Sequence, residues 1–259
     1  MTRTAVRLPR PVPGLGETVQ VTDPAAGAAP QAAVAVLVPG AAALGLLAPP
    51  STAVVPAALL ADAGWTAERL AERAARTGTA DRRVLATVWW YSASSVLLTP
   101  ALAGLVTGRP LSARLEDTTL SVLSGGLFVA ATSRAGGREP AAELRETMGA
   151  VIAAVAEAGR MRERPLWAIA TDSIANRLLA LGRALGNVTR ATGLAGPLAD
   201  DIGAPLPPPR YVDVAGARFT RRASCCLLYR VPHEPTCTSC PRRPPAERQI
   251  LLEDTATRS

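Results

Sequence analysis

Four cysteines near the C-terminal end are the residues of this sequence best suited to chemistry. They are Cys225, Cys226, Cys237 and Cys240, and they lie within 16 of the 259 residues. The second half of the set, C-x2-C, is typical of metal-binding turns, because two thiolates three residues apart can reach one ion. The first half is unusual, because neighbouring side chains of a strand point to opposite faces. Both neighbours can serve one site only if the backbone turns or bulges at this point.

Three interpretations of this spacing remain open. A binuclear iron–sulfur cluster spreads four thiolate ligands over two irons and can be reached from a wide range of directions. A structural zinc ion more often takes two C-x2-C pairs, and this chain has one. Disulfides need an oxidising compartment, yet residues 1–21 lack the apolar run of a secretory signal, so we expect a cytoplasmic protein. The single histidine, His233, is one too few for a Rieske centre, and we expect it to be solvated or to donate a hydrogen bond to the site.

The residues before the cysteines predict a helical body that must position them. Apolar side chains recur there at helical spacing, and capping residues mark where helices begin and end. The predicted helices lie near residues 67–76, after the N-cap Asp81, from Thr99–Pro100 to Gly108, from Pro140, and from Pro165 to Gly186–Asn187.

Between these helices, two runs rich in Thr, Val, Leu and Phe predict a β-hairpin. Residues 118–124 and 127–133 flank Gly125–Gly126, which supplies the positive φ that a tight hairpin turn needs. The predicted fold class is therefore α+β, with a helix-dominated body, a small antiparallel hairpin or sheet, and a short C-terminal module that carries the cysteines.

Composition divides the chain into three parts. Residues 1–31 are rich in Pro, Gly, Thr and Ala and predict a flexible N-terminal segment. Residues 32–203 form the predicted body. The run APLPPP, residues 204–209, is stiff and extended and cannot continue a helix. Residues 204–259 are therefore predicted as a C-terminal module, with a β-like segment that turns at Ala215–Gly216, then the cysteines and a terminal tail.

Charge and hydropathy argue against several classes of function. The formal net charge is +7, but the 28 basic residues are all Arg and are scattered without interleaved aromatics, so we expect no nucleic-acid partner. The lone histidine and the lack of a Gly-rich phosphate loop argue against hydrolases, kinases and Rossmann enzymes. Four prolines interrupt the apolar stretch of residues 32–60, which favours buried helices and loops over a membrane span. Peripheral association with the inner face of the membrane stays open.

Two segments around the cysteines resemble the C-terminal signature of the FhuF family. They are residues 221–230, RRASCCLLYR, and residues 237–241, CTSCP, and they reproduce the family spacing C-C-x10-C-x2-C. Members of this family are siderophore-iron reductases whose cysteines hold a [2Fe–2S] cluster. The resemblance implies that the four cysteines are the cluster ligands, that the substrate is a ferric siderophore, and that one electron releases its iron as Fe(II). No flavin or nicotinamide motif is present, which implies an external electron donor such as a reductase or a ferredoxin.

Arginines gather around the cysteines. Residues 210–243 contain seven Arg against two carboxylates, a local excess of +5. Positive charge near the sulfurs would stabilise a reduced cluster and would attract an anionic ferric complex. We expect Arg221, Arg222 and Arg230, together with Tyr229 beside them, to contact the cluster or the substrate.

The leading hypothesis is thus a cytoplasmic ferric-siderophore reductase. Two other functions are compatible with the cysteines: a zinc-stabilised interaction protein, and a [2Fe–2S] electron-transfer or redox-sensor protein without a siderophore substrate. The aromatic trio of residues 89–91 is expected to be mainly a buried anchor of the body.

Overall fold

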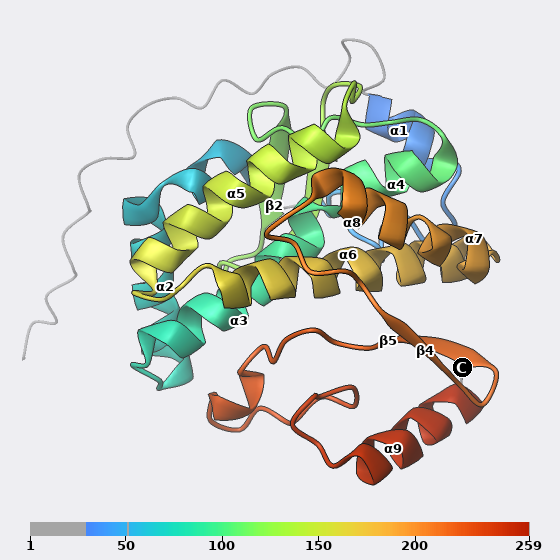
Figure 1. Cartoon of the computed structure of the whole chain (residues 1–259). Helices are drawn as coiled ribbons and strands as arrows, with labels where there is room; N and C mark the ends of the chain where they lie inside the picture. Colours follow the sequence, from blue (N-terminus) through green and yellow to red (C-terminus); the bar gives the residue numbers. More distant parts are fainter. Residues whose placement is uncertain (1–29, 51, 259) are drawn as a thin grey trace, which may run out of the picture.

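The computed structural model describes residues 30–50 and 52–258, and it has a helical body above a smaller C-terminal segment (Figure 1). The elements of the body are α1 (Pro30–Ala35), β1 (Ala53–Pro56), the 3₁₀ helix η1 (Ala57–Ala61), α2 (Ala63–Thr77), α3 (Arg82–Leu97), α4 (Thr99–Thr107), β2 (Thr118–Val122), β3 (Phe128–Ser133), α5 (Pro140–Ala158), α6 (Arg164–Ala184), α7 (Val188–Gly193) and α8 (Ala195–Ile202). The C-terminal segment contains β4 (Tyr211–Val214), β5 (Ala217–Thr220), the 3₁₀ helix η2 (Leu228–Arg230) and α9 (Pro245–Thr257). Of the N-terminal segment predicted to be flexible, only Pro30 and Gln31 are described, and both belong to α1.

The helices begin and end where their capping residues predict. The side chain of Asp81 accepts a hydrogen bond from the backbone of Val84 at 3.1 Å and so caps α3. Pro140 and Pro165 lie in the first turns of α5 and α6, where a missing N–H breaks no helical hydrogen bond. Gly108 ends α4 with a left-handed φ of 71°. The predicted helix-dominated fold is confirmed.

A three-stranded antiparallel sheet, in the order β1-β2-β3, packs against the helices. The predicted hairpin is its β2–β3 part, and Gly126 in the turn has a φ of 73°. The third strand, β1, falls within residues 32–60, which were predicted as buried helices and loops. It lies antiparallel to β2 with Val54 opposite Ser121. The sequence did not predict this strand, because four residues that end in a proline are too few to show the alternation of a β-strand. Among the described residues, no helix is long and apolar enough to cross a membrane.

Aromatic side chains join α2, α3 and the sheet at the centre of the body. The ring of Trp89 meets Trp65 of α2 and Phe128 of β3 edge-on, with centroid distances of 6.5 and 5.9 Å. Trp90 is 0% exposed, and its indole N–H donates to the carbonyl of Leu166 at 2.9 Å. Two of the three expected anchor residues are therefore buried, and they fix α3 between the sheet and α6.

The C-terminal segment begins with an extended run of backbone that lies alongside α6. The carbonyl of Pro207 accepts a hydrogen bond from Thr171 at 2.9 Å, and the hydroxyl of Tyr211 donates to the carbonyl of Ala175 at 3.1 Å. The β4–β5 hairpin then turns at Ala215–Gly216, as predicted. Helix α9 packs on this hairpin below the body (Figure 1). The buried side chains of this small cluster are Val214, Phe219 and Leu252.

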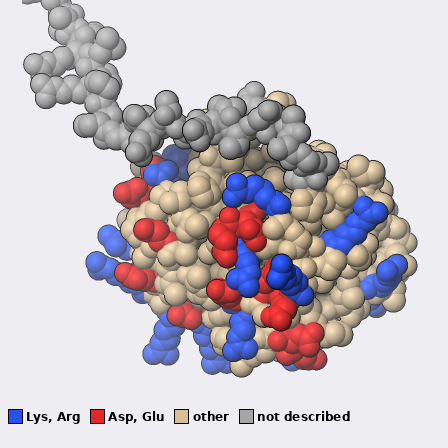
Figure 2. Space-filling view, turned by 90° about the horizontal axis from the view of Figure 1, so that it is seen from above, with Lys and Arg blue, Asp and Glu red and all other residues tan. Residues whose placement is uncertain are grey.

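Charged side chains of both signs are interspersed on the face of the molecule seen in Figure 2. Ion pairs also occur between single side chains: Arg114 lies within 4 Å of three glutamates, the exposed Glu116 and Glu146 and the buried Glu143. The net charge is thus not gathered into a continuous basic surface on this face.

Candidate metal centre

The loop between β5 and α9, residues 221–244, carries all four cysteines. Its backbone turns sharply directly after the neighbouring pair, since Leu227 adopts a left-handed φ of 60°. The C-x2-C turn closes through a hydrogen bond from the backbone of Cys240 to that of Cys237 at 3.1 Å. His233 is exposed. The loop therefore has the bend that two neighbouring cysteines need in order to face one region.

The four thiols lie in two contacting pairs. Cys226 and Cys237 share a hydrogen bond, and so do Cys225 and Cys240. Each pair joins one of the neighbouring cysteines to one cysteine of the C-x2-C turn. Cys226 and Cys240 are each 3% exposed, whereas the other two are half-buried. Nowhere in residues 30–50 and 52–258 are three or more His, Cys, Asp or Glu side chains grouped to hold a single metal ion.

Hydrogen bonding favours the thiolate at Cys226. The hydrogen bond from Cys237, helped by the backbone N–H of Leu228 and by Arg222, outweighs burial and lowers the pKa of Cys226 to about 5. The same hydrogen bond, together with burial, raises the pKa of Cys237. Burial also raises the pKa of Cys225. One thiol of the first pair is thus ready to act as a metal ligand, because the thiolate is the form that binds metal.

Arg222 lies against the first pair of thiols. Its Nη1 is 3.5 Å from Sγ of Cys226 and 3.4 Å from Sγ of Cys237, and its guanidinium stacks over the ring of Tyr91 at 4.8 Å. Burial by itself would lower the pKa of Arg222, but the charges of Cys226, Asp172 and Tyr91 outweigh it and raise that pKa. A permanent positive charge therefore lies beside two of the four sulfurs, as expected from the sequence.

Asp172 of α6 anchors the loop to the body and was not predicted. Its carboxylate, 1% exposed, accepts hydrogen bonds from the backbone of Ala223 at 2.6 Å and of Ser224 at 3.2 Å. It also accepts from the hydroxyl of Ser224 at 3.0 Å and from Nε of Arg222 at 3.3 Å. Burial raises the pKa of Asp172, and these donors oppose the shift. The signal in the sequence was a single carboxylate within the apolar run of a long helix, where a charge needs partners.

The other three neighbours expected at the site have other contacts in the structure. Arg221 is exposed, and Arg230 forms an ion pair of 3.1 Å with Asp81, the N-cap of α3. Tyr229 stacks with Arg242 at 4.9 Å. None of the three hydrogen-bonds or ion-pairs with a cysteine among the described contacts, so their contact with a substrate stays a prediction.

Two arginines that the sequence did not single out hold the backbone of the C-x2-C turn. Arg243 donates to the carbonyls of Cys237 at 3.1 Å and of Thr236 at 2.8 Å. Arg248 of α9 donates to the carbonyl of Cys240 at 3.5 Å. These contacts satisfy carbonyls that the irregular loop leaves without a ladder partner.

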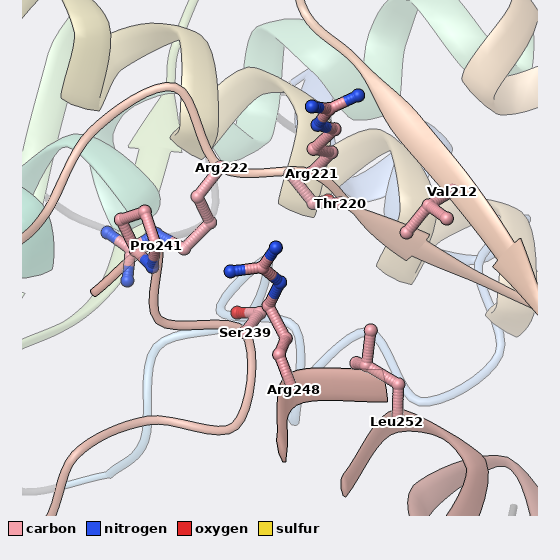
Figure 3. A pocket seen from close by; sticks show the side chains of 8 residues that line it. All are labelled: Val212, Thr220, Arg221, Arg222, Ser239, Pro241, Arg248 and Leu252. Atoms are coloured by element: carbon pink, nitrogen blue, oxygen red, sulfur yellow. The ribbon is translucent and has the colours of Figure 1, made fainter. Parts of the chain in front are cut away.

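A small pocket lies beside Arg222, between the β4–β5 hairpin and α9 (Figure 3). Its volume is about 230 Å³, and it is lined by Val212, Thr220, Arg221, Arg222, Ser239, Pro241, Arg248 and Leu252. Figure 3 shows Arg221 and Arg248 on opposite sides of it. Ligand pockets usually measure roughly 300–1,000 Å³, so this one is smaller than a usual ligand pocket.

Comparison with known proteins identifies the loop. Residues 222–242 match the FhuF 2Fe-2S C-terminal domain, and this match contains all four cysteines and Arg222. No curated protein matched the chain. The family resemblance of the cysteine segment is therefore confirmed, and the cofactor is a [2Fe–2S] cluster. The match spans 21 residues, from 222 to 242, so it describes the loop and not the helical body.

The residues of the loop fit such a cluster. Four thiols that lie in two contacting pairs would supply the four thiolate ligands that a binuclear cluster needs. Nη2 of Arg222 is buried and has no hydrogen-bond partner among the described atoms. A buried donor of this kind needs an acceptor, and a sulfide of the cluster would supply one.

Proposed function

We propose that this chain is a cytoplasmic ferric-siderophore reductase, with Cys225, Cys226, Cys237 and Cys240 as the ligands of its cluster. The observation that carries the proposal is the match of residues 222–242 to the FhuF 2Fe-2S C-terminal domain. The pairing of the four thiols within that segment supports the ligand set.

The reaction follows from the coordination chemistry of the substrate. Siderophores hold Fe(III) through hard oxygen donors, and these bind the softer Fe(II) far more weakly. When bound, the [2Fe–2S] cluster supplies one electron at a time. One electron therefore suffices to release the iron, and the step needs no general acid, base or nucleophile.

The protein's own residues prepare the site for this step. Arg222 brings positive charge to within 3.5 Å of two thiols, which favours the more negative, reduced state. Asp172 fixes that guanidinium and the backbone before Cys225 at the same time. Cys225 and Cys237 are half-buried whereas the other two thiols are buried, so we expect the electron to leave from this more exposed side of the site.

The proposal requires an external electron donor, a reductase or a ferredoxin. The formal net charge of +7 would also support peripheral association with an anionic membrane face, where ferric siderophores enter the cell.

The test begins with the purified protein. We expect equal iron and acid-labile sulfide, a red-brown colour that dithionite bleaches, and an electron paramagnetic resonance signal of the reduced cluster. Pre-reduced protein should then be reoxidised by a ferric siderophore in a stopped-flow experiment, with Fe(II) captured by a coloured chelator.

Two results would redirect the assignment. Colourless protein that carries stoichiometric zinc would support the zinc-stabilised interaction protein instead. A reducible cluster that no ferric siderophore reoxidises, but that a ferredoxin does, would make the chain an electron-transfer protein.

A further inference from the structure

Two adjoining cavities lie beside Cys225, on the side of the loop that faces the body. The first, of about 350 Å³, is lined by Arg83 of α3, by Arg164 and Pro165 of α6, and by Cys225 itself. The second, of about 480 Å³, shares Arg83, Arg164 and Pro165 with the first and adds Arg160 and Arg162. Because they share these residues, they form one groove that leads from Cys225 to the α5–α6 loop. Its size is in the range of ligand sites, roughly 300–1,000 Å³.

Four arginines, Arg83, Arg160, Arg162 and Arg164, give this groove its charge; we call it the arginine groove. All four are exposed. Within the described part of the chain, none of their guanidinium groups forms an ion pair or donates a hydrogen bond, unlike Arg222, which is paired with a carboxylate. Unpaired guanidinium groups along a cavity attract anions and bind their oxygens in bidentate geometry.

Acidic side chains near the groove are fewer than the arginines. Glu157 and Glu163 line a neighbouring hollow together with Arg160 and Arg162. Glu163 already accepts a hydrogen bond from the indole of Trp167 at 3.3 Å. The balance of four arginines against two glutamates leaves the groove positive.

The α5–α6 loop is held tightly against α3, so the groove has a defined wall. A Cβ at Gly159 would lie 2.5 Å from Cβ of Ala86, so the loop can approach α3 only with glycine there. The sulfur of Met161 lies 3.8 Å from the hydroxyl oxygen of Thr87. Arg160 between them has a left-handed φ of 49°, a strained conformation for a side chain of this size. Such strain recurs at binding sites, where it directs a side chain.

We propose that the arginine groove binds the substrate, and that the substrate is a ferric chelate with net negative charge. A tris-catecholate or a carboxylate-rich complex of Fe(III) is such an anion, whereas a tris-hydroxamate complex is neutral. The inference rests on the proposed reductase function. It places the chelate beside Cys225, where the Fe(III) of the chelate would accept the one electron that a reduced cluster supplies, without a proton or another bond taking part. The external one-electron donor then restores the reduced cluster.

The test compares R162Q/R164Q with the control R134Q/R190Q, which removes the same charge from exposed positions elsewhere. Binding to the oxidised holoprotein is measured by titration with a tris-catecholate complex of Ga(III), which cannot be reduced by the cluster. We expect R162Q/R164Q to weaken this binding about tenfold or more and to slow reoxidation of the reduced protein by the Fe(III) tris-catecholate similarly, more strongly at low salt. A neutral tris-hydroxamate should be affected less than about twofold, and the control should match the wild type.

Failure of this inference differs from failure of the proposed function. If the wild type reduces ferric chelates but R162Q/R164Q binds and reduces the anionic one normally, the groove is not the substrate site. An equal loss for the neutral and the anionic chelate would overturn the preference for anions. If R162Q/R164Q slows only reduction of the cluster by an acidic ferredoxin, the groove binds the donor instead. If the wild type reduces no chelate at all, the proposed function itself fails.

Discussion

The body around α3 and α6 and the cysteine loop, residues 221–244, differ in how they are stabilised. The body buries a continuous apolar core that includes Trp90, Leu166 and Ile169, all at 0% exposure. In the loop only Cys226, Val231 and Cys240 are buried as whole residues, together with the side chain of Arg222. Apolar burial stabilises by roughly 25 cal/mol per Å², so we expect the body to hold its shape by itself. We expect the loop to depend on its polar anchors and on the cluster instead.

This difference has a consequence for the function. A loop without a ladder or a core of its own can adopt the bend that two neighbouring cysteines require, which a regular strand cannot. The body supplies what the loop lacks: the Asp172 carboxylate, the N-cap Asp81 that pairs with Arg230, and the apolar side chains of Val84 and Val88 that cover Val231. The rigid part of the molecule thus positions the part that carries the chemistry.

Removal of the cluster should give the largest effect. It should loosen the cysteine loop and leave the body unchanged. We expect Cys226→Ser to lose the normal cluster, because one of its four proposed ligands is replaced by a weaker one. Amide hydrogen exchange in residues 221–244 should then accelerate by about 100-fold or more, while the centres of α3 and α6 keep their protection. Iron content, the visible spectrum and exchange measured by mass spectrometry check this.

Ser239→Ala is the matched control, since this residue lies inside the C-x2-C turn without being a proposed ligand. It should keep both iron and protection. An unchanged spectrum in Cys226→Ser would refute the ligand set. Equal loss of protection in α3 and α6 would show that the body also depends on the cluster.

Loss of the Asp172 anchor should have the next largest effect. Asp172→Ala leaves the buried Arg222 without its carboxylate and two backbone N–H groups without an acceptor. Breaking a buried pair in this way typically costs about 3–5 kcal/mol, and we expect that cost in the free energy of opening of the loop. Hydrogen exchange of residues 221–226 and the rate of iron loss to a chelator measure it.

A double variant shows whether the pair itself is responsible. In Asp172→Ala/Arg222→Met no charge is left buried, so the double variant should cost less than the sum of the two single changes. The exposed Asp201→Ala in α8 should change nothing measurable. Strict additivity would mean that Asp172 and Arg222 act on the loop independently.

Loss of the positive charge of Arg222 should lower the reduction potential of the cluster without removing the cluster. We expect Arg222→Gln to bind iron but to lower the reduction potential by about 60 mV or more, a tenfold change for a one-electron couple. Arg221→Gln removes the same charge from the neighbouring, exposed position and should shift the potential much less. Dye-mediated redox titration followed in the visible spectrum compares them. Equal shifts would indicate that the total charge of the loop, rather than the contact with two sulfurs, sets the potential.

Local signals in the sequence sufficed for helices α2 to α6, the hairpin and the cofactor, whereas α7 and α8 were not predicted. Asp81, Pro140 and Gly126 each act within a few residues of their own position, so their effects can be read from the sequence alone. Strand β1 was missed because Val54 and its neighbours are a strand only through their pairing with β2.

The residues around the cluster could be predicted only in part, for the same reason. Local charge drew attention to several arginines, but it could not distinguish Arg222, which faces two sulfurs, from Arg230, which pairs with Asp81. Asp172 lies 50 residues from Arg222 in the sequence, and only the packing of α6 against the C-terminal segment brings them together.

The smallest effect is expected from the exposed ion pair of the β4–β5 hairpin, which tests whether surface charge also holds the C-terminal segment. Arg218 donates to both carboxylate oxygens of Asp213 at 2.8 Å. The hydrogen bond from Arg218 lowers the pKa of Asp213. Because the pKa of Asp213 is lowered in the folded protein, the ion pair contributes to stability at pH values above the ordinary pKa of about 4. This contribution is lost as the pH falls through the pKa of the folded state. Asp213→Asn should therefore melt within about 2 °C of the wild type at neutral pH, and the two melting curves should converge below about pH 4. Its cluster and potential should be unchanged. Release of iron from this variant would show that the hairpin, and not Asp172 of the body, holds the loop in place.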